Sequence, residues 1–150
     1  MSLPIIPGPN NQLITASAVP TYGSTANYAQ DTQGAITITT GGSFPKNVVS
    51  GSITTFGNPV LIMCSGDANP LSAGGWGIIQ LYRGSTALCQ TIQYESSAAN
   101  ENVPYNISCV DPVPAGTYTY YLKVNSMAGG NTTFGEDSGP NLILVELSRV

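Results

Sequence analysis

The segment from Asp111 to Ser126 limits the possible folds more than any other part of the chain. Pro112 and Pro114 lack a backbone N–H and have a fixed φ, and Gly116 adds conformational freedom, so the first half is a turn and not a helix. The second half alternates with a period of two, which predicts a strand with one buried and one wetter face. The predicted buried face carries Tyr118, Tyr120, Leu122 and Val124, and the other face carries Thr117, Thr119, Tyr121 and Lys123.

Short segments of the same kind recur along the chain, separated by residues that favour turns. We expect strands at residues 34–40, 47–56, 60–64, 76–83, 86–94, 103–110, 117–124 and 142–147, with a further short one near 13–18. Gly84-Ser85 fits the two-residue turn of a hairpin. The continuous apolar run from Val60 to Cys64 predicts a strand buried on both faces, whereas residues 65–75 are expected to form a loop.

This pattern contains no segment with a convincing helical period and predicts an all-β, antiparallel β-sandwich or barrel. Residues 13–150 are expected to form one domain, and residues 1–12, which are rich in Pro, Gly and Asn, an extended arm or linker. The final apolar run, 142–147, is expected to lie centrally in a sheet, because an exposed apolar edge promotes aggregation. In a double-sheet jelly roll, the first and last strands commonly lie together in this way.

Charge and composition argue against several classes of function. Only 8% of the residues are charged, against roughly 25% in an ordinary domain. The net charge is −4 with four cations in total, so nucleic-acid binding is not expected. The chain has no histidine, which removes the commonest general base. No apolar run approaches the ~20 residues of a membrane span, and we expect neither membrane insertion nor a signal peptide.

The three cysteines, Cys64, Cys89 and Cys109, have neither a CxxC nor a zinc-binding spacing. Each lies in or beside an apolar or β-rich run, so we expect buried thiols. Because their number is odd, at least one is free or pairs with another chain.

Two candidate ligand-binding sites lie in the predicted loop 65–75 and at the start of the strand that follows it. Asp67 and Asn69, with Glu136 and Asp137 from another loop, offer oxygen ligands for calcium, although solvated loop acids are the simpler interpretation and no metal site is predicted. Trp76, flanked by glycines, offers a sugar-stacking platform, and the alternative is a tryptophan buried in the sandwich.

Three tyrosines of the predicted strand 117–124 are candidates for a subunit interface, where aromatic residues are enriched: Tyr118, Tyr120 and Tyr121. One face of that strand must fill the core, so only part of the set is expected to contact another subunit. Asp111 is expected to cap its turn rather than to act as a catalytic acid. No catalytic residue and no cofactor are predicted, because no serine lies in a G-x-S-x-G motif and no histidine is present to activate one.

Four segments occur in a familiar order: Gly57-Asn58-Pro59-Val60-Leu61-Ile62, Leu81-Tyr82-Arg83-Gly84-Ser85-Thr86, Asp111 to Tyr121, and Leu142 to Leu147. This layout resembles C-terminal domains of phage tail-fibre and other virion-surface proteins, across roughly residues 35–147. The resemblance implies a jelly roll like that of tumour necrosis factor and the complement head, assembled as a homotrimer. It also implies a location on a virion or another extracellular surface.

The leading hypothesis is therefore a non-enzymatic structural or receptor-binding head. Its loops 65–75, 95–102 and 127–140 would face a host-surface glycan or protein. The second hypothesis is a monomeric carbohydrate-binding module of a secreted protein, which uses Trp76. The third is a hydrolase that depends on carboxylates, for which no spacing gives support.

Overall fold

The computed structural model describes residues 28–147, which form strands and connecting loops without a helix, and hence without a helix that could cross a membrane. The predicted arm 1–12 and the short strand near 13–18 lie outside these residues. The strands are β1 (Tyr28–Thr32), β2 (Ile36–Ile38), β3 (Lys46–Thr55), β4 (Val60–Pro70), β5 (Trp76–Arg83), β6 (Thr86–Ala87), β7 (Ile92–Glu95), β8 (Val103–Asp111), β9 (Gly116–Ala128), β10 (Thr132–Phe134) and β11 (Asn141–Glu146).

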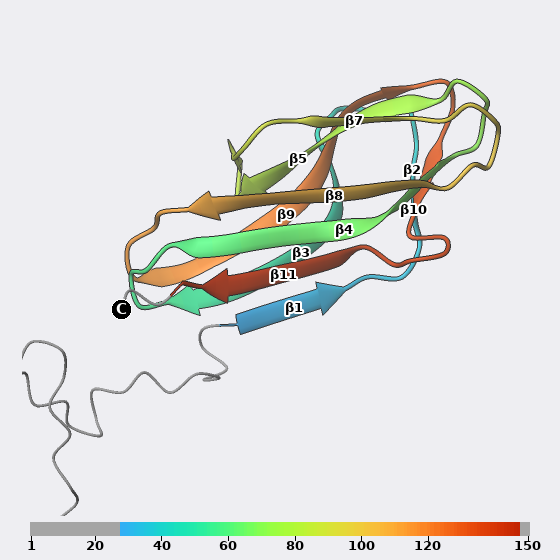
Figure 1. Cartoon of the computed structure of the whole chain (residues 1–150). Helices are drawn as coiled ribbons and strands as arrows, with labels where there is room; N and C mark the ends of the chain where they lie inside the picture. Colours follow the sequence, from blue (N-terminus) through green and yellow to red (C-terminus); the bar gives the residue numbers. More distant parts are fainter. Residues whose placement is uncertain (1–27, 148–150) are drawn as a thin grey trace, which may run out of the picture.

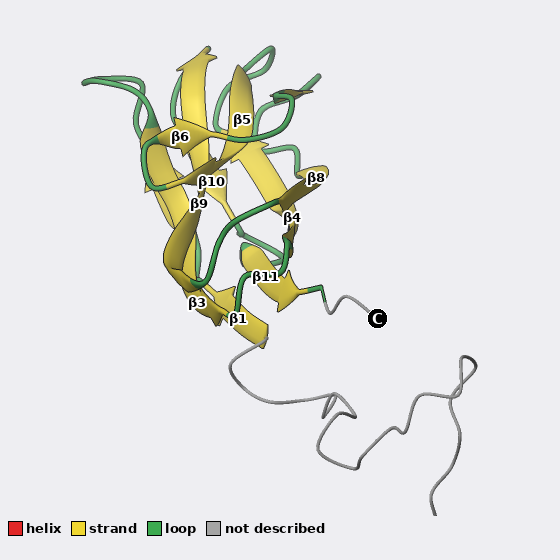
Figure 2. Ribbon diagram, turned by 90° about the vertical axis from the view of Figure 1, so that its left-hand side faces the viewer, coloured by secondary structure: helices red, strands yellow, loops and turns green. Residues whose placement is uncertain are grey.

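The strands form two antiparallel sheets that pack as a β-sandwich, which confirms the predicted class (Figure 1). The first sheet runs β1-β11-β4-β8, and β10 and β2 extend it beside the far end of β4. The second sheet runs β3-β9-β5, and β5 pairs on its other side with β6 and β7. In Figure 2, β3 and β9 lie to the left, and β4, β8 and β11 lie to the right.

The final strand is central, as expected for an apolar run. β11 pairs with β1 on one side and with β4 on the other, so neither of its edges is exposed. Its inward residues Leu142 and Leu144 are fully buried.

Strand β9, which contains the predicted strand 117–124, is the centre of the second sheet and has the predicted alternation of buried and more exposed side chains. Tyr120, Leu122 and Val124 are fully buried, whereas Thr117 is exposed and Lys123 is half-buried. Because β9 pairs along its length with β3 and β5, its inward face supplies the middle of the core.

Strand β4 differs from the prediction in two ways. It continues through Gly66 to Pro70, although these residue types disfavour strands, because β8 and β10 pair with this stretch. The run Val60–Cys64 is also not buried on both faces. Val60, Ile62 and Cys64 are buried, but Leu61 and Met63 are half-buried on the outer surface.

The predicted hairpin keeps its turn but loses part of its return strand. Gly84 has a φ of 58°, as its tight turn requires. The return segment forms only β6 and β7, and residues 88–91 between them belong to no strand. At the other end of the hairpin, Gly77 lies directly over the buried Tyr94, and a Cβ at this position would be 2.3 Å from the Tyr94 hydroxyl.

One end of the sandwich is closed around the carboxylate of Glu146, which is 4% exposed. Its Oε1 accepts hydrogen bonds from Thr55 Oγ1 (2.6 Å), Phe56 N (2.7 Å), and both Asn58 N and Asn58 Nδ2 (3.1 Å each). Burial acts to raise the pKa of Glu146, but these four donors outweigh it and lower the pKa. The last inward residue of β11 thus holds the turn between β3 and β4.

Replacing Glu146 with Gln should remove a charge-assisted anchor and lower the free energy of unfolding by about 1–2 kcal/mol at neutral pH. The folded pKa is lower than the unfolded one. The contribution is therefore complete above the ordinary value of 4.5 and is lost as the pH falls through the folded pKa. Urea unfolding of wild type and Glu146→Gln at several pH values should show the gap closing in acid. The exposed Glu95 provides the control Glu95→Gln, and a gap that widens in acid would contradict this assignment.

Candidate functional site

The predicted ligand residues do not form one site. Asp67 and Asn69 lie on β4 in the first sheet, and Trp76 lies on β5 in the second. Each is described below with its surroundings, followed by the loop cluster and the two outer faces of the sandwich.

Asp67 anchors a loop instead of facing a ligand. It is 5% exposed, and its carboxylate accepts hydrogen bonds from Ser138 N (2.7 Å) and Glu136 N (3.1 Å). Its carbonyl oxygen also accepts from Gly135 N at 2.9 Å. The prediction that Asp67 lies on a loop is wrong, because it is a strand residue that holds the loop between β10 and β11.

Asn69 is likewise a buried strand residue, 2% exposed. Its Nδ2 donates to Asn102 Oδ1 at 2.7 Å, and the Asn102 amide donates in turn to the Asp137 carboxylate. Among residues 28–147, no three acidic or cysteine side chains are grouped as metal ligands. With Asp67 engaged by backbone donors, the geometry does not support the calcium hypothesis for these residues.

The outward-facing loops predicted from the sequence meet at one end of the sandwich. Leu71 N donates to Asn131 O (2.9 Å), Gly74 N to Ser96 O (3.0 Å) and Asn100 N to Pro70 O (2.9 Å). These bonds join residues 71–75, 96–101 and 129–131 into one surface, which we call the loop cluster. The described chain begins and ends at the opposite end, where Tyr28 pairs with Val145 and Leu147 N donates to Pro59 O.

Trp76 faces outward, so the interpretation of a tryptophan buried in the sandwich is wrong. It is half-buried and alternates with Gly77, which is buried and points inward. The ring of Tyr94 from β7 fills the interior below Gly77 and leaves no room there for a larger side chain. Trp76 therefore lies on the outer surface of the second sheet.

Further along the same outer surface, side chains from β5 and β9 form a hydrogen-bonded network. Tyr82 OH donates to Asn125 Oδ1, and Asn125 Nδ2 donates to Gln80 Oε1, both at 2.8 Å. Lys123 Nζ lies 4.8 Å and 4.7 Å from the ring centres of Tyr82 and Tyr121 and donates to Gly84 O at 2.9 Å. We call this surface the aromatic face; it consists of Trp76, Gln80, Tyr82, Tyr121, Lys123 and Asn125. Fixed ring surfaces beside amide groups suit a polyhydroxylated ligand.

The outer surface of the first sheet has a different character. Leu61 is the register partner of Val110 on one side and of Val145 on the other, and Met63 is the partner of Ile143. Val110 is 53% exposed, and the other four side chains are half-buried. We call these five residues the apolar face. The outward positions beside it, Ser65, Asn106, Ser108 and Asn141, are uncharged.

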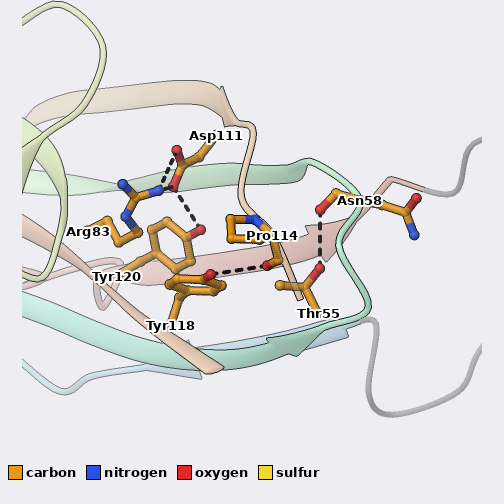
Figure 3. Close-up of polar contacts among 7 residues, drawn as sticks. All are labelled: Thr55, Asn58, Arg83, Asp111, Pro114, Tyr118 and Tyr120. Carbon is orange, nitrogen blue, oxygen red and sulfur yellow. Dashed lines mark hydrogen bonds and ion pairs between the residues drawn. The ribbon is translucent and has the colours of Figure 1, made fainter. Parts of the chain in front are cut away.

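The three candidate interface tyrosines have different surroundings. Tyr121 lies on the aromatic face. Tyr118 is half-buried, and its hydroxyl donates to Pro114 O at 3.1 Å, which pins the proline turn (Figure 3). Tyr120 is fully buried and donates to Asp111 Oδ2 at 3.0 Å. It has no surface with which to contact another subunit, so its assignment to an interface is wrong.

Asp111, which is buried, forms an ion pair with the half-buried Arg83 instead of the predicted turn cap. Its carboxylate accepts two hydrogen bonds from Arg83 Nη1, at 2.9 Å and 2.8 Å, besides that of Tyr120 (Figure 3). Burial is the main cause that raises the pKa of Tyr120, and the hydrogen bond to Asp111 adds to it. These contacts join β8, β5 and β9 and are structural.

Sequence reasoning missed Gln80, Tyr82, Lys123 and Asn125 as members of one surface. The period of two in residues 76–83 and 117–124 indicates which side chains share a face within each strand. It does not indicate the register that places side chains of the two strands next to each other. Comparison with known proteins adds no assignment: the chain matches no protein-family model, and no curated protein is detectably similar to it.

The different positions of neighbouring tyrosines lead to a prediction. Tyr120→Ala should lower the free energy of unfolding by about 3–5 kcal/mol, because it opens a cavity and leaves Asp111 with Arg83 alone. Tyr121→Ala should cost under about 1 kcal/mol, because it changes a surface residue. Urea unfolding checks both values, and equal losses would contradict the burial difference described above.

Proposed function

We propose that the chain is a non-enzymatic head domain of a virion or phage tail, which assembles as a homotrimer and presents loops to a host-surface glycan or protein. The observation that carries the proposal is the uncharged apolar face on the first sheet. A surface of this kind favours association with a second protein surface, because packing removes apolar area from water without desolvating a charge.

The order of the strands supports a jelly roll of the type found in tumour necrosis factor. The sheets run β1-β11-β4-β8 and β3-β9-β5-β7, and most connections cross from one sheet to the other. The first and last strands of the described chain, β1 and β11, are neighbours. Both features agree with the double-sheet arrangement of jelly rolls.

The positions of the loops and chain ends support a receptor-binding head. The loop cluster lies at one end of the sandwich, and the described chain enters and leaves at the other. If the domain is attached to a larger assembly at the end where the described chain enters, the loop cluster lies at the end away from the point of attachment. The predicted loop 65–75 contributes only residues 71–75 to this surface, since β4 continues to Pro70.

Assembly through the apolar face can be tested with a single substitution that introduces a charged side chain there. Val145→Lys places an ammonium group among Leu61, Met63 and Ile143, and burying it unpaired against another subunit would cost several kcal/mol. We expect light scattering coupled to size-exclusion chromatography to show a trimer for the wild type at micromolar concentration and a monomer for Val145→Lys.

The matched control for this experiment is Ser52→Lys, which adds the same charge at an exposed position of β3, on the other sheet, and should remain trimeric. Circular dichroism of both variants establishes that each is folded. A wild type that is strictly monomeric, or a trimer that survives Val145→Lys, would contradict assembly through this face.

A carbohydrate-binding module is the second candidate, and the outward position of Trp76 on the aromatic face favours it. We expect Trp76→Ala to weaken binding to any glycan found by array screening by about fivefold or more, because stacking contributes about 1 kcal/mol or more. Phe56→Ala, which removes an exposed aromatic side chain from the turn between β3 and β4, is the control. Unchanged affinity in a folded Trp76→Ala variant would remove the aromatic face as the binding site.

A further inference from the structure

A groove opens on the first sheet, where β8, β4 and β11 lie side by side (Figure 1). Its volume is about 590 Å³, which is within the range of about 300–1,000 Å³ that is typical of small-molecule sites. No charged side chain lines it, so it offers no ion pair to a charged ligand. Its polar and small lining residues come from the three strands and from the loop before β11: Ser65, Gly66, Asn106, Ser138, Gly139 and Asn141.

Three side chains form a polar row across this groove. Asn106 on β8 is the register partner of Ser65 on β4, and Ser65 is the partner of Asn141 on β11. Because neighbouring strands lie about 4.8 Å apart, the two amide side chains belong to strands ~10 Å apart. The row thus places a small hydroxyl side chain between two amides.

The fold leaves most polar groups of this row without a partner. Asn141 Oδ1 accepts hydrogen bonds from Gln30 Nε2 (3.0 Å) and Thr32 Oγ1 (3.4 Å), which orient the amide. Within the described part of the chain, the Nδ2 group of Asn141 and the side chains of Asn106 and Ser65 form no hydrogen bond. The row therefore presents both donors and acceptors to a ligand.

The wall that the loop between β10 and β11 contributes is held in place. Ser138 N donates to the buried carboxylate of Asp67 at 2.7 Å, and Gln33 N donates to Pro140 O at 3.0 Å. Gly139 packs so closely against Gln33 O that a Cβ would not fit there. A site whose walls are already fixed loses little conformational entropy when a ligand binds.

A buried hydroxyl without a partner lies beside the groove. Tyr105, which also lines the groove, is 5% exposed, and its hydroxyl forms no hydrogen bond with the described residues. This hydroxyl lies against Gly66, where a Cβ would be 2.6 Å from the hydroxyl oxygen. Buried polar groups nearly always have a partner, so a hydroxyl-bearing ligand that enters beside Gly66 would satisfy this group.

We propose that this groove binds a neutral saccharide. The hydroxyl groups of a sugar donate to and accept from the amides and the hydroxyl of the row, and a neutral sugar needs no ion pair. An extended peptide fits the groove less well. β4 and β11 are each paired on both sides here and have no free edge to which a peptide strand could be added.

The inference rests on the proposed function in one respect, which is that the ligand is a glycan. It does not depend on assembly, because one chain supplies every residue of the groove. It also assigns the glycan to a surface other than the loop cluster and the aromatic face.

The experiment probes an array of neutral and sialylated oligosaccharides with the full chain, followed by calorimetric titration of the strongest neutral oligosaccharide. We expect neutral oligosaccharides to bind. Asn106→Ala should weaken the affinity by about fivefold, because it removes hydrogen bonds to the sugar. Ser65→Leu should abolish binding, because the larger side chain fills the middle of the row.

The matched controls are Asn47→Ala and Ser52→Leu, which make the same changes at exposed positions of β3 on the other sheet and should keep the wild-type affinity. Circular dichroism establishes that each variant is folded. Full binding by a folded Ser65→Leu variant would overturn the inference, and loss of that binding in Trp76→Ala would assign the glycan to the aromatic face.

The variant Val145→Lys separates the ligand from assembly. Binding of a neutral oligosaccharide that persists in this variant and is lost on adding Ser65→Leu would support the groove, whether or not the wild type is a trimer. A trimeric wild type that binds only sialylated oligosaccharides, or none, would overturn the inference and leave the proposed assembly intact.

Discussion

The packing of two apolar sheet faces against each other is the interaction on which the rest of this structure depends. β9 and β11 are each paired on both sides, and their inward residues Tyr120, Leu122, Leu142 and Leu144 are fully buried in one core. An outer strand can be irregular, as β6 and β7 are, because the two central strands retain their partners. The outward-facing positions of these strands do not contribute to the core, so they can hold side chains of other kinds.

The few charges of the chain include structural anchors. Three of its eight acidic residues, Asp67, Asp111 and Glu146, are buried, and each accepts hydrogen bonds from a different part of the fold. Glu146 holds the turn after β3, Asp67 holds the loop after β10, and Asp111 joins β8 to β5 and β9. A buried carboxylate is stable only where donors compensate for lost hydration. These acids therefore mark places where a loop or strand is fixed in a single position.

The sequence predicted what depends on local pattern. The alternation in β9, the central place of 142–147 and the tight turn at Gly84 follow from periodicity and turn chemistry, and the structure agrees with all three. The sequence did not predict features that depend on residues far away in the chain. β4 continues through Asp67 because β8 pairs with this stretch, and the backbone of Glu136 and Ser138 satisfies the Asp67 carboxylate. Trp76 faces outward because Tyr94 occupies the interior below Gly77.

The two outer surfaces of the sandwich differ in a way that bears on assembly. On the aromatic face, the polar groups of Gln80, Tyr82 and Asn125 bond to one another, and Lys123 is held between two rings. Covering this surface with a second subunit would desolvate the ammonium group of Lys123, which costs free energy unless a partner compensates. The apolar face carries no charge, and its five side chains would lose only apolar contact with water. Of the two surfaces, the apolar face is therefore better suited to subunit packing, and the aromatic face is better suited to remain open to solvent or to a polar ligand.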